Sequence, residues 1–528
     1  MARRALALSP PAWPGAVAAG GLAALCLGTL AVLARAGQGG AGQGGGGLGP
    51  ADIAAIRFTL SQAALSALLS VALAVPVARA LARRRFAGRA AFVTALGAPF
   101  LLPVIVAVLG LVAIFGQRGA VNAALGALGL PAVDVYGLGG VVLAHVFLNL
   151  PLAVRMILHG WQAIPAERLR LAASLGFSAR EVARHIERPM LRAVLPGALL
   201  AIFLVCLGSF AVALILGGGP RATTVELAIY QAVRFDFDLG RAALLALVQA
   251  GLCAAAVVAA GAMAAPSGFG PGAGRRIEAV PGAAGPVARA ADALVLLAAA
   301  ALISAPIAAV VARGLPEIAT LPAPVWQAAL RSALIAPVSA AVAVAGAVAL
   351  LGPILRGGAG GRAAEVAAML PVVASPLVLG AGLFLLLFPV IAPDRVALGV
   401  TAVLNGVLAL PFVLRLLIPP AREIAAAEGR LAAALGLSAA GFLRLVLLPR
   451  LRRPLGFGAG VAVAFAMGDL GVIALFATEA PTLPLQVMRL MGAFRMDEAA
   501  GAALLLVVMA FAGFALCDRW GRGGDAQA

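Results

Sequence analysis

Apolar stretches of about 20 residues recur from one end of this 528-residue chain to the other. That is the length a helix needs to cross the hydrocarbon core of a bilayer. Hydrophobic residues make up 63% of the chain and charged residues 11%, whereas soluble domains average roughly 45–50% and about 25%. The composition therefore excludes a water-soluble protein. Strands of a membrane β-barrel would show ten-residue alternation, which the sequence lacks.

The apolar stretches predict an all-α polytopic membrane protein with about twelve transmembrane helices. The first six are expected at 13–35, 51–79, 91–115, 138–158, 193–216 and 241–264, and the second six at 291–312, 328–355, 365–391, 396–418, 455–476 and 497–517. We interpret the first stretch as a retained helix, because it is longer than the roughly 7–15 residues of a signal-peptide core. A Gly/Pro-rich segment, 265–290, predicts a cytoplasmic linker between the halves 1–264 and 291–528.

The basic residues predict the orientation of the chain. All 39 are arginines, and the net charge is +18. Because the arginines lie in short loops between apolar segments, nucleic acid is not the expected partner. Most fall on one side when the N-terminus is placed inside, above all in the loops near 160–192 and 419–453. The arrangement predicts that both termini are cytoplasmic. Without lysine, the chain has no ordinary P-loop for ATP.

No pattern in the sequence indicates a catalytic or metal site. The cysteines Cys26, Cys206, Cys253 and Cys517 stand singly in apolar stretches, and the three histidines share no ligand spacing with them. The outer loops have no paired carboxylates of the kind that acid–base catalysis uses. We therefore expect neither a resident metal nor an enzymatic activity in this chain.

An internal repeat is the strongest signal in the sequence. Residues 148–192 align without gaps on 408–452, at a shift of 260. Within them RLAASLGFSA (170–179) lies over RLAAALGLSA (430–439), with eight of ten positions identical. Six helices return a chain to the side where it started, so the copies have the same orientation. The sequence thus predicts two parallel repeats of six helices, with a substrate path between the halves.

The repeated loop has the signals of two short helices joined by a glycine turn. Residues 166–175 favour a helix, and Gly176 suits the left-handed position that ends it. Ser178 followed by Glu181 is a capping box for a second short helix, expected to stop near Pro189. The residues singled out in the two loops are Arg170, Ala172, Ala173, Gly176, Ser178, Pro189, Arg430, Ala432, Ala433, Gly436, Ser438 and Pro449.

Two interpretations of these loops are open. One is an amphipathic segment that its arginines hold on anionic lipid. The other is docking to a symmetric cytoplasmic partner, which the presence of two matching copies favours.

The loops resemble the cytoplasmic E-A-A-x-x-x-G loop of ABC importer permeases. Ala172 with Gly176 and Ala432 with Gly436 match that pattern, whereas arginine stands at the acidic position and leucine at the first alanine in both copies. The resemblance implies a type I ABC importer permease, the MetI-like fold. It also implies that each loop docks into a groove on a cytoplasmic ABC ATPase.

Further segments are similar to the fused permeases of thiamine importers. These are FTLSQAALSALLS (58–70), LAHVFLNLPLAVR (143–155), GGGPRATTVELAIYQA (217–232), GDLGVIALF (468–476) and TLPLQV (482–487). The resemblance implies a bacterial inner-membrane subunit that takes up thiamine or its phosphates. Its partners would be two copies of the ATPase, which bind ATP and Mg²⁺, and a periplasmic substrate-binding protein. A permease for ferric iron or another small solute remains an alternative, as does an ion-coupled secondary transporter.

Several polar residues in apolar segments are candidates for the translocation path. They are Asp469, Ser209, Asn149, Asn405 and His145. A carboxylate at the bilayer centre costs roughly 2.5–3.5 kcal/mol on insertion scales, so Asp469 should face the bundle interior or water. It could contact a cationic thiazolium or serve gating, and Ser209 occupies the matching place in the first half. Two interpretations of the asparagines are open: they bind substrate, or they satisfy carbonyls freed by Pro151 and Pro411.

The loops 220–238 and 479–496 are expected on the outer side. Each can form a short helix, which would either meet the binding protein or lie as a plain re-entrant or surface helix.

Overall fold

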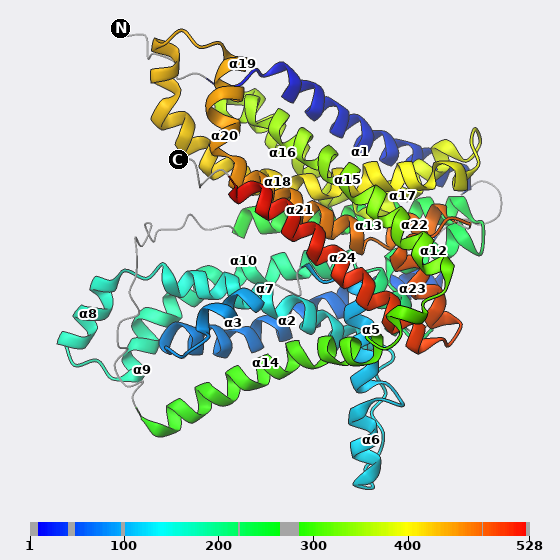
Figure 1. Ribbon diagram of the computed structural model, residues 1–528, viewed down its shortest axis with the longest axis horizontal. Coiled ribbons are helices and arrows are strands. Elements are labelled where there is room, and N and C mark those ends of the chain that lie inside the picture. Colours follow the sequence, from blue (N-terminus) through cyan, green and yellow to red (C-terminus); the bar gives the residue numbers. More distant parts are fainter. Residues whose placement is uncertain are drawn as a thin grey trace. The chain divides into compact units, whose positions relative to one another are not determined.

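A computed structural model describes residues 9–40, 48–96, 101–219, 222–263, 285–477 and 479–523. The described residues form helices and no strands (Figure 1). By length and composition, eleven of these helices can cross a membrane. The pair α16 (Gly358–Ala374) and α17 (Pro376–Leu387), bent by 87°, is a twelfth candidate. The prediction of an all-helical membrane protein with about twelve spans is confirmed.

One compact unit, called here the first-half unit, contains Pro50–Thr224 and Leu252–Ala312. Its elements are α2 (Pro50–Arg83), α3 (Arg89–Ala95), α5 (Val104–Phe115), α6 (Ala120–Ala127), α7 (Leu138–Gln162), α8 (Ala166–Ser174), α9 (Ala179–Val182), η1 (Ala183–Glu187), α10 (Arg188–Leu207), α11 (Ala211–Leu216), the end of α13 (Leu239–Met263) and α14 (Pro286–Gly314). Its core forms where α2, α7 and α10 pack together, around residues such as Val71, Ile157 and Ile202.

The other compact unit, the second-half unit, contains Met1–Gly49, Val225–Gly251 and Arg313–Ala528. Its elements are α1 (Trp13–Gly40), α12 (Val225–Arg234), the start of α13, η3 (Ile318–Thr320), α15 (Ala323–Arg356), α16, α17, α18 (Pro393–Ala434), α19 (Ala439–Phe442), η4 (Leu443–Leu447), α20 (Leu448–Arg450), α21 (Arg452–Gly468), α22 (Gly471–Phe476), α23 (Leu483–Gly492) and α24 (Met496–Arg522). Helix α15 packs along α18, and α21 packs along α24. A Cβ at Gly406 would lie 2.7 Å from the carbonyl oxygen of Ser339, so glycine permits the close crossing of α15 and α18.

The compact units do not coincide with the halves of the sequence. Helix α1 packs on α15, α16 and α17, whereas α14, the first helix after the linker, belongs to the first-half unit. The second-half unit therefore includes α1, α12 and the start of α13 from the first half of the chain, and the first-half unit includes α14 from the second. The repeats 1–264 and 291–528 remain a prediction about the sequence, because packing groups the helices differently. The predicted linker 265–290 lies outside the described residues up to 284, and from Pro286 the chain is already α14.

The structure corrects several predicted spans. The third span is Val104–Ala127 instead of 91–115, because Pro103 directly precedes the start of α5. The fifth and eleventh expected helices, 193–216 and 455–476, are each broken near their C-terminal end. Helix α18 continues for 16 residues beyond the expected end at 418, through Pro419 and Pro420.

Candidate functional site

The first repeated loop folds as two short helices around a glycine, as its sequence predicts. Helix α8 ends where Gly176 adopts a left-handed backbone with φ of 68°. The N–H of Phe177 then donates to the carbonyl of Ala172 at 2.9 Å, which closes the helix end. Ser178 caps α9 through a complete capping box with Glu181. The loop is therefore a hairpin whose shape follows from local hydrogen bonds.

The second loop repeats the glycine turn, the serine cap and the π-helix at the corresponding positions. Gly436 has φ of 74°, and the N–H of Leu437 donates to the carbonyl of Ala432 at 3.0 Å. Ser438 accepts a 3.0 Å hydrogen bond from the N–H of Gly441. A five-residue π-helix follows in both copies, η1 and η4, again 260 residues apart. Two sequences that differ at several positions thus build one local structure.

Two details differ from expectation. Pro189 does not stop the second short helix, because the chain continues from η1 into α10 with Pro189 in the first turn. A missing N–H is tolerated there. Pro449 occupies the same place in α20. The first short helix is separate only in copy one, where Pro165 precedes it, whereas in copy two it is the end of α18.

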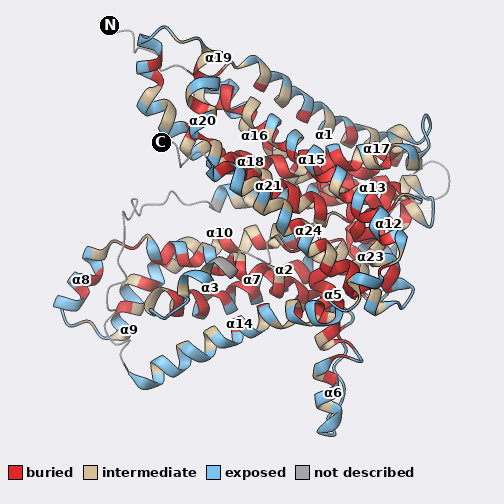
Figure 2. Cartoon of the chain, in the orientation of Figure 1, coloured by how far each residue is buried: buried red, intermediate tan, exposed pale blue. Residues whose placement is uncertain are grey.

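Both loops expose a set of apolar side chains beside arginine. Leu171, Leu175, Leu431 and Leu435 are 59–71% exposed, while Ala172 and Ala432 are buried against the hairpin. The pale segments of α8 and α9 in Figure 2 show how little of the first loop is covered. Arg170 and Arg430 are exposed next to the leucines. An apolar centre with a charged rim, present twice, is typical of a protein-docking surface.

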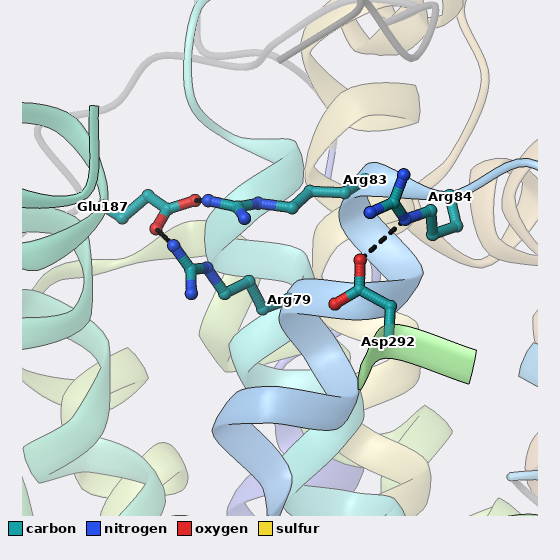
Figure 3. A network of polar contacts seen from close by, with 5 residues as sticks. All are labelled: Arg79, Arg83, Arg84, Glu187 and Asp292. Atoms are coloured by element: carbon teal, nitrogen blue, oxygen red, sulfur yellow. Dashed lines mark hydrogen bonds and ion pairs between the residues drawn. The ribbon is translucent and has the colours of Figure 1, made fainter. Parts of the chain in front are cut away.

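The two loops are attached to their helices by different contacts. Glu187, at the end of η1, is buried and accepts hydrogen bonds from Arg83 at 2.6 Å and pairs with Arg79 at 3.1 Å (Figure 3). Leu447, buried as well, occupies the same place in copy two. There Glu428 of α18 pairs with Arg450 of α20. The ion pairs that attach the first loop to α2 therefore have no counterpart at the corresponding position of the second loop, where leucine stands.

The candidate path residues of the first-half unit meet in one cluster. His145 of α7 lies between two hydroxyls, with Nδ1 3.2 Å from Ser66 Oγ and Nε2 2.7 Å from Ser209 Oγ. The amide of Asn149 donates to the carbonyl of His145 and to Cys206 Sγ. The carbonyl that Pro151 leaves without its helical N–H is that of Phe147, so this bond to His145 is not the one that the position of Asn149 suggested. His145 and Ser209 are in direct contact.

The same two positions meet in the second-half unit. Asn405 and Asp469, at a shift of 260 from His145 and Ser209, lie side by side, and the Asp469 carboxylate faces the backbone N–H groups at the start of α22. Here the polar atoms are not all satisfied. Thr401 Oγ1 has no hydrogen-bond partner among the described residues, and Asn405 Nδ2 and Asp469 Oδ2 face each other without a hydrogen bond of standard geometry. Buried polar groups normally have partners, so this cluster has unused capacity for a ligand or water.

Ser209 and Asp469 both lie at breaks in a helix. Ser209 stands between α10 and α11, and Asp469 between α21 and α22. Both side chains are partly exposed. In membrane transporters, discontinuous helices often form the substrate site, because the break frees backbone groups near the midplane. The structure thus places two candidates, one in each unit, where such sites occur.

Sequence reasoning missed residues that contribute to these clusters. Helix α2 has a buried polar stripe, Thr59, Gln62, Ser66 and Ser70. Its members are spaced by three or four, which is a signal that the sequence contains. Gln62 donates to the carbonyl of Cys206 at 2.9 Å, and Ser66 meets His145. The stripe is therefore the third side of the cluster formed by α7 and α10.

The loops expected on the outer side are largely buried helices. In α12, Glu226 is fully buried facing Ser375 and Gln249, and burial raises the pKa of its carboxyl group to about 7. Helix α23 buries Leu483, Leu485 and Leu490 in the same way. Exposed residues follow each helix, notably Phe235 and Phe494. A surface helix is thus excluded for α12, and the turns after the two helices expose apolar side chains that a partner could contact.

Among the residues that the structure describes, no group of three or more His, Cys, Asp or Glu side chains could hold a metal ion.

Comparisons with known proteins cover up to 98% of the chain. No family model matches it. It is 37% identical over 530 residues to the thiamine transport system permease protein ThiP of Brucella abortus (strain 2308), which covers 98% of this chain and 97% of that protein. It is 38% identical over 479 residues to ThiP of Salmonella typhimurium, or 88% of each chain. The molybdenum transport system permease protein ModB of Azotobacter vinelandii is 30% identical over 184 residues, 34% of this chain and 81% of that protein.

Proposed function

Because the chain belongs to the family of thiamine transport system permeases, we propose that it is the membrane-spanning subunit of an ATP-driven importer for thiamine or thiamine phosphates. The chain forms the path for the solute and hydrolyses no ATP itself. The observation that supports coupling to an ATPase is the loop structure built twice, with the same glycine turn, the same cap and the same exposed leucines.

Each loop docks one copy of a cytoplasmic ABC ATPase, which binds ATP and Mg²⁺. The exposed leucines supply the apolar contact, and Arg170 and Arg430 stand at its rim. Two loops favour two ATPase copies. Both termini and the linker then lie in the cytoplasm of a bacterium, with the chain in its inner membrane. A periplasmic binding protein delivers the solute to the turns after α12 and α23, where Phe235 and Phe494 are exposed.

The solute path takes a polar position from each repeat at the helix breaks. Asp469 with Asn405 offers a carboxylate and an amide with free capacity, which suits a cationic solute. His145 with Ser209 is fully hydrogen-bonded and neutral partners surround it, so it supports the path wall. Of the two clusters, the one around Asp469 is the better candidate for solute contact.

Reconstitution tests the proposed function. The purified chain is placed in proteoliposomes with its ATPase and the binding protein, and uptake of radiolabelled thiamine, thiamine phosphates and ferric iron is compared. We expect uptake of thiamine compounds only, and only with hydrolysable ATP. Uptake driven by an ion gradient without the ATPase would contradict the proposal and indicate a secondary transporter. Uptake of iron alone would contradict the proposed identity of the substrate.

A change of Asp469 to asparagine tests the path. Asp469→Asn removes one charge but keeps the shape and the contact with the N–H groups of α22. We expect uptake to fall at least about tenfold, because the cationic solute loses its counter-charge at the break. Asp134→Asn is the matched control, since Asp134 is exposed and caps a turn through the N–H of Tyr136.

Measuring uptake beside ATP hydrolysis stimulated by the binding protein separates the possibilities. Lower uptake with normal stimulation indicates a role in passage, and equal uptake by wild type and Asp469→Asn would rule out a charge requirement.

A further inference from the structure

A cleft of about 840 Å³ opens in the first-half unit between the end of α2, the start of α3 and the first turns of α14. Its lining includes Arg84, Arg85, Arg289, Leu296, Leu297 and Ala300. Pockets of this volume are large enough to hold a small-molecule ligand. The arginines lie at one end and the apolar residues of α14 at the other.

The basic end of the cleft has more positive than negative charge. Glu187 pairs with Arg79 and Arg83, and Arg84 Nε donates to Asp292 Oδ2 at 2.6 Å (Figure 3). Arg85 and Arg289 line the cleft as well. Among the described residues, Arg79, Arg83, Arg84 and Arg289 are thus four positive charges near two carboxylates. Arg84 Nη2 is buried without a hydrogen-bond partner, and Arg289 has no ion pair within the described part of the chain. The site can accept an anion.

The apolar part of the cleft runs along α14, from its first turn towards the middle of the helix. Leu297 lies eight residues beyond Arg289, about 12 Å along the helix axis towards the middle of α14. Leu297 is 68% exposed, and Figure 2 shows the outer face of α14 as exposed along its first turns. Helix α14 is itself a candidate membrane span. An anion at Arg289 thus sits at headgroup depth, with an apolar groove running from it towards the hydrocarbon.

We propose that this cleft binds an anionic phospholipid such as phosphatidylglycerol. The phosphate lies against Arg84, Arg85 and Arg289, and the first part of one acyl chain lies along Leu296, Leu297 and Ala300. Basic pockets between helices on the cytoplasmic side are suited to anionic headgroups. A soluble anion would bind the arginines only and would leave the apolar half of the cleft unoccupied. The assignment to the cytoplasmic leaflet rests on the proposed function, because Arg83 joins this end of α2 to the first loop.

Native mass spectrometry of the purified chain in detergent tests the proposal. The protein is equilibrated with equal amounts of dioleoyl phosphatidylglycerol and dioleoyl phosphatidylcholine, whose acyl chains are identical. We expect wild type to retain phosphatidylglycerol preferentially, and the double variant Arg85→Gln/Arg289→Gln to retain it about tenfold more weakly. The control is Arg118→Gln, an exposed arginine elsewhere in the same unit. Equal retention by the double variant and wild type would overturn the proposal, as would equal retention of the two lipids by wild type.

A second arm separates a lipid site from a phosphate site. Leu297→Gln keeps every arginine and changes an exposed position, so the fold is not at risk. We expect it to weaken phosphatidylglycerol retention several-fold. Soluble glycerol phosphate, which has the same phosphate ester without acyl chains, should not displace the lipid at millimolar concentration. Displacement of the lipid by glycerol phosphate, or unchanged lipid retention by Leu297→Gln, would contradict the lipid proposal and indicate a site for a soluble anion. None of these readouts requires transport, so their failure is distinct from a failure of the proposed function.

Discussion

Uptake is expected to be lost when Gly176 and Gly436 are both changed to glutamate, while the chain stays in the membrane. Both glycines have positive φ, and a Cβ at either would meet nothing within 4 Å. The change therefore causes no clash. It disfavours the left-handed backbone by about 1–2 kcal/mol at each turn and sets a carboxylate beside the exposed leucines. The transmembrane helices are untouched, so insertion should be normal while the ATPase loses its docking surface.

The matched control for this variant is Gly129→Glu. Gly129 has the same φ of 68°, is equally open around its Cβ and lies outside both loops. The double variant Gly176→Asn/Gly436→Asn is a second control, because asparagine tolerates the left-handed region. Uptake, membrane content and co-purification of the ATPase are measured together. Normal uptake by the glutamate double variant, or equal losses with Gly129→Glu, would show that these turns do not couple the chain to a motor.

The hairpin loops could be predicted from sequence because their signals are local. Gly176 ends a helix and Ser178 with Glu181 begins the next, all within six residues, and the structure has each of these features. The helix end expected at Pro189 is wrong for an equally local reason. A proline in the first turn after η1 lacks only an N–H that the turn does not need, so the chain stays helical.

The polar clusters could be predicted only in part. The repeat shift of 260 aligns His145 with Asn405 and Ser209 with Asp469. In the structure His145 contacts Ser209 in the first-half unit, and Asn405 contacts Asp469 in the second-half unit. The contribution of Ser66 depends on how α2 packs along α7, which no local pattern states. The exchange of α1 and α14 between the compact units depends on long-range packing in the same way. These features follow from tertiary contacts, and the sequence signals for them are weak.

Replacing Glu187 by leucine is expected to destabilise the first-half unit by about 3–5 kcal/mol. Leucine is what the second repeat has at this place, in a fully buried position. In the first repeat it would leave Arg83 buried beside Arg79 with no carboxylate between them (Figure 3). The Arg83 pair dominates, because both of its side chains are less than one-tenth exposed, whereas Arg79 is 36% exposed and screened by solvent. The cost is that of an uncompensated buried charge.

A double-mutant cycle distinguishes this cause from simple loss of packing. Glu187→Leu/Arg83→Leu removes both partners, and stability should largely return, because apolar replacement of a buried ion pair is often neutral. Thermal melting of the four purified proteins in detergent measures the coupling. Glu428→Gln is the control, since its pair with Arg450 is more exposed and should contribute about 0–1 kcal/mol. If Glu187→Leu melts like wild type, the cluster does not hold the loop. The double variant could also melt normally while the solute-loaded binding protein no longer stimulates ATP hydrolysis. In that case the ion pair both anchors the first loop and transmits the movement of the loop to α2.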